Sequence, residues 1–256
     1  HPRTPTRPGS TVDDVPRPPR HLAPALLRVT RAPRAYNQAR YTMRLNQMLA
    51  EVTGLTDDFG EWQYFVSFFG HPSLDAPWGF QLDGLHLAIN CVAVGDHLAM
   101  TPMFMGSEPC EVRTGRFAGI RVLDDEQRAG LDLIRSLDAD QQQAAIQYAS
   151  IMPDSMPAHL RHPTDHLTQS GAFHDNAVVP YLGIRADAFS AAQRARLLEA
   201  ITAYIGRAHG SHATAQVAEG TAHRNETGFA GLGGTGPGHP AADRLHVQAV
   251  TNELER

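Results

Sequence analysis

Lysine is absent from this chain of 256 residues, so all 22 of its basic side chains are arginines. Several enzyme classes depend on a lysine that binds phosphate or forms a Schiff base. The absence therefore argues against P-loop NTPases, protein kinases, pyridoxal-phosphate enzymes and Schiff-base aldolases. A sequence without lysine that is rich in alanine and arginine also indicates a bacterial source with GC-rich DNA.

Cysteine is nearly absent as well, with only Cys91 and Cys110 in the chain. Two thiols cannot form a four-cysteine zinc site or hold an iron–sulfur cluster that needs four thiolates. Both cysteines lie in apolar sequence, so we expect buried free thiols. A single disulfide between them is the alternative.

The chain also lacks an excess of basic charge and a long apolar run. Its net charge is −5 with a pI near 6.3, which argues against a nucleic-acid partner. No apolar run approaches the roughly 20 residues of a membrane span, and the first residues have no apolar segment typical of a secretory signal. We therefore expect a soluble cytoplasmic protein with no membrane partner. Its oligomeric state is left open.

The order of expected elements predicts an α+β fold. Residues 1–20 are rich in proline and arginine and predict a disordered leader, followed by a single domain over 21–256. Helices are expected at 36–52, 124–137, 138–149, 190–205 and 212–226, and loops at 102–109, 151–180 and 231–240. Asp124 is expected to cap the second of these helices, and Asp138 with Gln141 and Ser190 with Gln193 predict capping boxes for the third and fourth. Strands are expected at 64–69, 78–82, 85–94, 97–101, 117–122 and 245–250. This order favours a central antiparallel sheet built from residues 62–122 with helices packed against it.

His86 is the first candidate site residue, because it lies inside the apolar run 85–94. In a strand, alternation would place His86, Ala88 and Asn90 on one face. Gly84 beside it would permit close approach of a ligand to the backbone. The alternative is a core histidine that is hydrogen-bonded to a carbonyl, and the residues alone leave both interpretations open.

The remaining histidines and glycines carry weaker signals. His159, His162 and His166, and also His209 and His212, have spacings that could meet a metal from one helix face. Pro163 interrupts the first group and neither has an HExxH pattern, which favours solvated loop histidines. Residues 231–236 match GxGxxG, but prolines follow where a helix should begin, which argues against a dinucleotide site.

Several short motifs resemble the bacterial and fungal family called domain of unknown function 3500. The motifs are Phe69-Gly70-His71-Pro72-Ser73, Trp78, Gly84-Leu85-His86-Leu87 with Asn90, Phe104-Met105-Gly106, Glu108-Pro109, Gly233-Gly234 and Arg244-Leu245-His246. Leu85 replaces the first of the family's paired histidines. A later histidine-containing segment of the family has no counterpart. The resemblance therefore predicts a fragment or divergent member, incomplete at both ends.

The resemblance implies a pocket shared by the histidine strand, the Gly-Gly loop and the Arg-x-His strand. On this basis His86 and His246 would bind a divalent metal (Zn, Fe or Mn), with Glu253 or Glu108 as an oxygen ligand. Glu108 and Arg244 would be the catalytic residues, and Arg244 would hold an anionic group. Trp78, Asn90, Gly233 and Gly234 would line the substrate pocket.

Two functions follow from these expectations. The first is a metal-dependent enzyme, hydrolase-like, that acts on a small molecule by activating water or a carbonyl. The second is a non-catalytic domain that binds a small ligand or has a structural role, with no metal and with His86 and His246 as buried hydrogen-bonding residues. The replacement of the first family histidine by Leu85 favours the second function, whereas the density of polar residues at strand positions favours the first.

Overall fold

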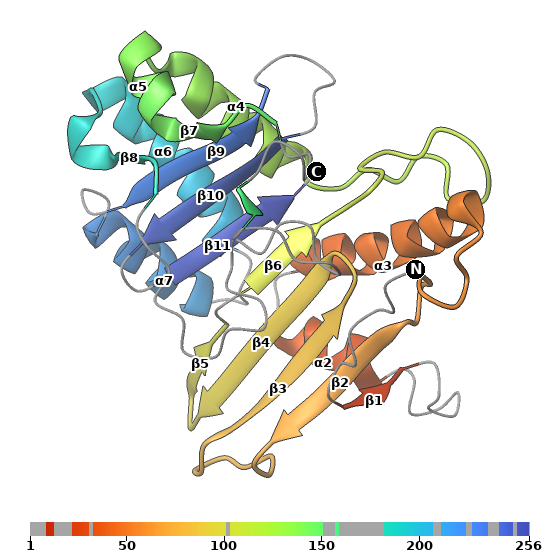
Figure 1. Ribbon diagram of the computed structural model, residues 1–256. Coiled ribbons are helices and arrows are strands. Elements are labelled where there is room, and N and C mark those ends of the chain that lie inside the picture. Colours follow the sequence, from red (N-terminus) through yellow and green to blue (C-terminus); the bar gives the residue numbers. More distant parts are fainter. Residues whose placement is uncertain are drawn as a thin grey trace.

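The protein folds as an α+β structure in which helices pack against a mixed, mostly antiparallel sheet (Figure 1). The computed structural model describes residues 9–12, 22–30, 33–100, 103–150, 157–158, 182–206, 211–223, 227–234, 241–247 and 250–255, with backbone only for the strands after residue 240. The predicted fold class is confirmed. The sheet is larger than predicted, because it recruits strands from outside residues 62–122.

The first half of the sheet is an antiparallel series of strands. Its members are β1 (Ser10–Thr11), β2 (Tyr64–Phe69), β3 (Trp78–Gly84), β4 (Leu87–Val94), β5 (His97–Ala99) and β6 (Met103–Gly106). β3 lies between β2 and β4, and β4 pairs with both β5 and β6. The short strand β1 pairs with β2, so part of the predicted leader belongs to the sheet.

The second half of the sheet joins the first through a parallel pairing between β6 and β11 (Val250–Glu255). β11 pairs antiparallel with β10 (Ala241–Val247), which pairs antiparallel with β9 (Gly228–Gly233). β9 also pairs with β7 (Ile146–Tyr148) in parallel and with β8 (Ile184–Arg185) antiparallel. The strand order is therefore β1-β2-β3-β4-β6-β11-β10-β9-β7.

Two groups of helices accompany the two halves of the sheet (Figure 1). α2 (Leu22–Thr30) and α3 (Pro33–Thr53) lie beside β1–β6. Beside β7–β11 lie α4 (Asp124–Ser136), α5 (Ala139–Ala145), the 3-10 turn η3 (Ala186–Ala188), α6 (Ala191–Ile205) and α7 (Ser211–Ala222). One continuous cluster of buried apolar side chains spans both halves. Within the described residues, no helix is long and apolar enough to cross a membrane.

Two predicted capping boxes are confirmed and are joined to each other. Asp138 caps α5 with Gln141, and Ser190 caps α6 with Gln193. The side chains of the two glutamines also meet, because Gln193 Nε2 donates to Gln141 Oε1 at 2.8 Å. Gln193 Nε2 donates in addition to the carbonyl of Ser136 at 2.8 Å, which ties the end of α4 to the start of α6.

The segment between β6 and α4 does not form the strand predicted at 117–122. The chain turns there, with positive φ at Gly115 and Gly119, and only an isolated bridge joins Glu111 to Arg121. The predicted N-cap Asp124 is the first residue of α4 instead, after Leu123 in a left-handed conformation (φ 64°). Glycines at positive φ break the extended backbone that alternating apolar residues suggested.

Three other expectations need correction. The predicted loop 102–109 contains β6, and the predicted loop 231–240 begins inside β9. The single strand predicted at 245–250 is a hairpin of β10 and β11. In each case long-range pairing, which the local sequence does not encode, determines the strand. The predicted irregular region 151–180 lies almost entirely outside the described residues. Neither cysteine forms a disulfide, and Cys91 is buried as expected, whereas Cys110 is half-buried.

Replacement of Gly84 in β3 by alanine tests how closely the Tyr64 ring packs there, and the same replacement at Gly231 in β9 is the control. A Cβ at Gly84 would overlap the ring of Tyr64, which is fully buried, whereas a Cβ at Gly231 would meet nothing within 4 Å. We expect Gly84→Ala to lower the free energy of unfolding by about 1–3 kcal/mol. Gly231→Ala should change it by less than about 1 kcal/mol. Denaturant unfolding of both variants measures their free energies of unfolding. Equal values would contradict the close packing of Gly84 against the Tyr64 ring.

Candidate functional site

The turn between β3 and β4 carries His86 in a strained conformation. Gly84 pairs with Leu87, so only Leu85 and His86 form the turn, and His86 has φ 61°. A positive φ at the second position of such a turn is normally filled by glycine or asparagine. The prediction that His86 lies in a strand is therefore wrong. Ala88 and Asn90 do lie on one face of β4, opposite the buried side chains of that strand.

Buried hydrogen bonds hold this turn in place. The carbonyl of Leu85 accepts from the Tyr64 hydroxyl at 2.9 Å and from Asn46 Nδ2 at 3.3 Å. Asn46 Nδ2 also donates to the Tyr64 hydroxyl at 3.0 Å. The carbonyl of His86 accepts from the backbone N–H of Gly106 at 2.8 Å. Helix α3 and strands β2 and β6 thus fix the turn from three sides, which offsets the strain at His86.

Two polar atoms beside this network lack a partner among the described residues. Thr42 Oγ1 and Asn46 Oδ1 are buried, and neither makes a hydrogen bond there. The two side chains lie one helical turn apart, so they share a face of α3. Buried polar atoms nearly always have a hydrogen-bond partner, so these two oxygens are an exception within the apolar surroundings of α3.

The imidazole of His86 is neutral over the physiological pH range. Burial lowers its pKa from the usual 6.5 to about 4, because the charged form loses its solvation. The side chain is still partly exposed to solvent. A neutral imidazole has one nitrogen that donates a hydrogen bond and one that accepts. The unprotonated nitrogen is the atom that can bind a metal.

The strand register places the start of the predicted Gly-Gly loop at the same end of the strands as His86. Gly106 lies level with Glu255, which lies level with Ala242, and Gly233 pairs with Ala241 one step further on. The His86 turn and the start of the Gly-Gly loop therefore lie at the same end of their strands. Four strand spacings separate β4 from β9, however, or roughly 19 Å.

The register does not bring the backbones of His86 and His246 together. Three strand spacings separate β4 from β10, and His246 lies four residues along β10 from the position level with Gly106. Together these offsets amount to roughly 19 Å. Arg244 and Glu253 lie directly opposite each other on β10 and β11. Their side chains and that of His246 lie outside the described part of the structure, so ligation and catalysis by these residues remain predictions.

The other predicted site residues do not surround His86. Trp78 lies at the far end of β3, where its Nε1 donates to the carbonyl of Ser73 at 3.0 Å. Asn90 pairs with Gln81 in the middle of β4. Glu108 is exposed and precedes a cis Pro109. Among the residues that the structure describes, no three His, Cys, Asp or Glu side chains are arranged to hold a metal ion.

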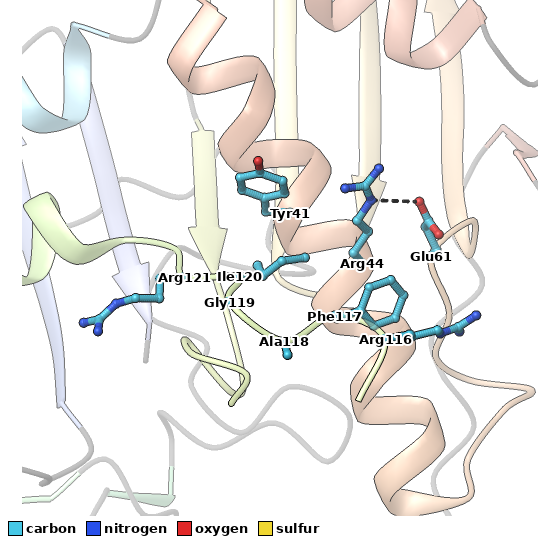
Figure 2. A pocket seen from close by; sticks show the side chains of 9 residues that line it. All are labelled: Tyr41, Arg44, Glu61, Arg116, Phe117, Ala118, Gly119, Ile120 and Arg121. Carbon is cyan, nitrogen blue, oxygen red and sulfur yellow. Dashed lines mark ion pairs between the residues drawn. The ribbon is translucent and has the colours of Figure 1, made fainter. Parts of the chain in front are cut away.

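A hollow between α3 and the loop before α4 escaped the sequence analysis. It is open to solvent and has a volume of about 640 Å³, and its lining includes Tyr41, Arg44, Glu61, Arg116, Phe117 and Arg121 (Figure 2). The sequence feature that could have pointed to this hollow is an arginine followed by an aromatic residue, at 40–41 and again at 116–117. The sequence could not show that these two pairs, far apart in the chain, line one space.

Comparison with known proteins places the chain among proteins without an assigned activity. The profile of a family described as "Protein of unknown function (DUF3500)" matches residues 1–255. No curated protein matches the chain, and no solved structure matches it. The family match covers the turn, the strand ends and the hollow alike, so it does not single out one of them.

The burial of His86 predicts a pH dependence of stability. The unfolded chain takes up a proton near pH 6.5, whereas the folded chain resists protonation until about pH 4. The unfolded state therefore binds more protons between these values, and stability falls as the pH falls. Lowering the pH from 7.5 to 5 should remove about 2 kcal/mol through this group.

A His86→Asn variant tests this dependence, because asparagine tolerates a positive φ but does not titrate. The free energy of unfolding of both proteins is measured at the two pH values. We expect the variant to lose about 2 kcal/mol less than the wild type on acidification. Equal losses would show that His86 is not desolvated in the fold.

Proposed function

This chain belongs to the DUF3500 family of proteins of unknown function, and we propose that it binds a small molecule at the β3–β4 turn through the neutral imidazole of His86. In this proposal the imidazole contacts the ligand directly. The backbone of the turn and the end of β6, where the N–H of Gly106 donates to the His86 carbonyl, form its surroundings.

The observation that supports the proposal is the cost of placing a histidine at this position. A left-handed conformation costs a residue with a Cβ roughly 1–2 kcal/mol, and burial adds the penalty seen in the lowered pKa. Glycine would avoid both costs. Strained and desolvated residues of this kind cluster at functional sites, where the side chain itself is needed.

The chemistry of the site favours binding over proton transfer. A base is most effective when its pKa lies near the working pH, and a pKa of about 4 is far below it. The neutral ring can instead donate one hydrogen bond and accept another. We therefore place a polar group of the ligand, such as a hydroxyl or amide, against His86.

A metal-dependent hydrolase is the second candidate function. The observation that favours it is again the neutral imidazole, because a protonated ring cannot bind Zn, Fe or Mn. In this candidate Glu253 and His246 supply further ligands, and Glu108 and Arg244 act on the substrate. The backbone separation of His86 and His246 weighs against that pair of ligands.

The two candidates are separated by elemental analysis and thermal melting of three purified proteins: wild type, His86→Asn, and the exposed control His97→Asn. A metal-free wild type that is stabilised by a member of a panel of sugars, amino acids and nucleosides supports the binding function, provided that only His86→Asn abolishes the shift. Near-stoichiometric metal that is lost only in His86→Asn supports the hydrolase instead. Metal content and melting shifts that are the same in all three proteins would contradict both.

A further inference from the structure

The hollow beside α3 has the size of a small-molecule site and is open to solvent. Its volume of about 640 Å³ lies within the range of roughly 300–1,000 Å³ that is usual for such sites. One wall comes from α3, another from residue 61 before β2, and the third from residues 116–121 (Figure 2). The site lies away from His86, because Arg44 and Asn46, two residues apart on α3, face opposite sides of that helix.

The lining concentrates positive charge in a protein that is acidic as a whole. Three arginines and one glutamate line the hollow, whereas the net charge of the chain is −5. The glutamate, Glu61, is already committed to Arg40, whose Nη2 lies 2.7 Å from Glu61 Oε1. The Arg40 guanidinium also stacks over the ring of Trp62 at 4.6 Å, so this pair is held in place from two directions.

Arg44 is the arginine whose donors remain available. Its Nε lies 3.7 Å from Glu61 Oε1, which is an ion pair but too long for a hydrogen bond. Its guanidinium lies 5.9 Å from the centre of the Tyr41 ring, and 42% of its side chain is exposed. Among the described residues, no hydrogen bond engages its guanidinium, which is a fork suited to bind a carboxylate with two parallel bonds.

The other two arginines are engaged elsewhere. Arg121 binds Asp124 at 2.9 Å and lies 3.5 Å from Glu111, and Figure 2 shows its side chain pointing away from the rest. Arg116 forms an ion pair with Glu51 at the rim. Its guanidinium also stacks over Phe117 at 4.5 Å. Of the three arginines that line the hollow, Arg44 is therefore the one with donors to offer an anionic ligand.

Apolar walls flank this charge. The rings of Tyr41 and Phe117 and the side chain of Ile120 border the hollow in Figure 2. Gly119 adds bare backbone, since a Cβ there would meet nothing within 4 Å. A ligand with a flat ring beside its anionic group would contact these walls while its carboxylate meets Arg44.

We propose that the hollow between α3 and residues 116–121 binds a small cyclic carboxylate, with Arg44 on the carboxylate and Tyr41 and Phe117 against the ring. This site is independent of the function proposed for His86. In this proposal Arg44 donates two parallel hydrogen bonds to the ligand carboxylate. Its contact with Glu61, which Arg40 holds, is too long to be a hydrogen bond.

Titration calorimetry with benzoate tests the proposal, with benzamide as its uncharged analogue and inorganic phosphate as an anion without a ring. We expect saturable benzoate binding that is at least tenfold tighter than binding of either analogue. Arg44→Gln should weaken benzoate binding roughly tenfold or more, because it removes a charge-assisted contact. The control Arg185→Gln, which removes an exposed, ion-paired arginine outside the hollow, should leave the affinity unchanged.

Glu61→Gln gives an opposite and more specific outcome. It removes the carboxylate that competes for Arg44, so benzoate should bind several-fold more tightly, an effect that general damage to the fold would not produce. Melting curves confirm that each variant is folded. Benzoate that fails to saturate at 10 mM, that binds no better than benzamide or phosphate, or that binds equally well to Arg44→Gln would overturn the proposal.

Discussion

The hydrogen bonds from Asn46 and Tyr64 to the carbonyl of Leu85 are the interaction on which the site depends. They join the buried face of α3, the first residue of β2 and the β3–β4 turn at a single oxygen. Gly84 leaves the space in which the Tyr64 ring reaches that oxygen. Because the carbonyl before His86 is fixed in this way, the unfavourable φ of His86 is maintained by its surroundings rather than by its own preference.

Helix α3 divides two polar environments. Its inner face contributes Thr42 and Asn46, which lie at most 1% exposed among apolar neighbours next to the turn. Its outer face contributes Tyr41 and Arg44 to the arginine-lined hollow. The same 21 residues therefore supply both proposed binding sites.

The sequence predicted the elements whose signals are local and missed those that depend on distant partners. The strand at 64–69 and the caps at Asp138 and Ser190 were predicted correctly, because alternation and capping are properties of neighbouring residues. His86 was misplaced, because a turn without central glycine or asparagine has the same pattern as a strand. The Arg44 hollow and the separation of His86 from His246 depend on tertiary packing and register, which the local sequence does not contain.

The parallel pairing of β6 with β11 also has a consequence during synthesis. The strands from β1 to β6 leave the ribosome early, and β6 is then the edge of an unfinished sheet whose backbone groups on one side are unpaired. Its partner emerges only after all the helices from α4 to α7. During that interval a second nascent chain could pair with β6 in place of β11. The four residues of β6 therefore remain an unpaired edge of the sheet until the end of this sequence has been made.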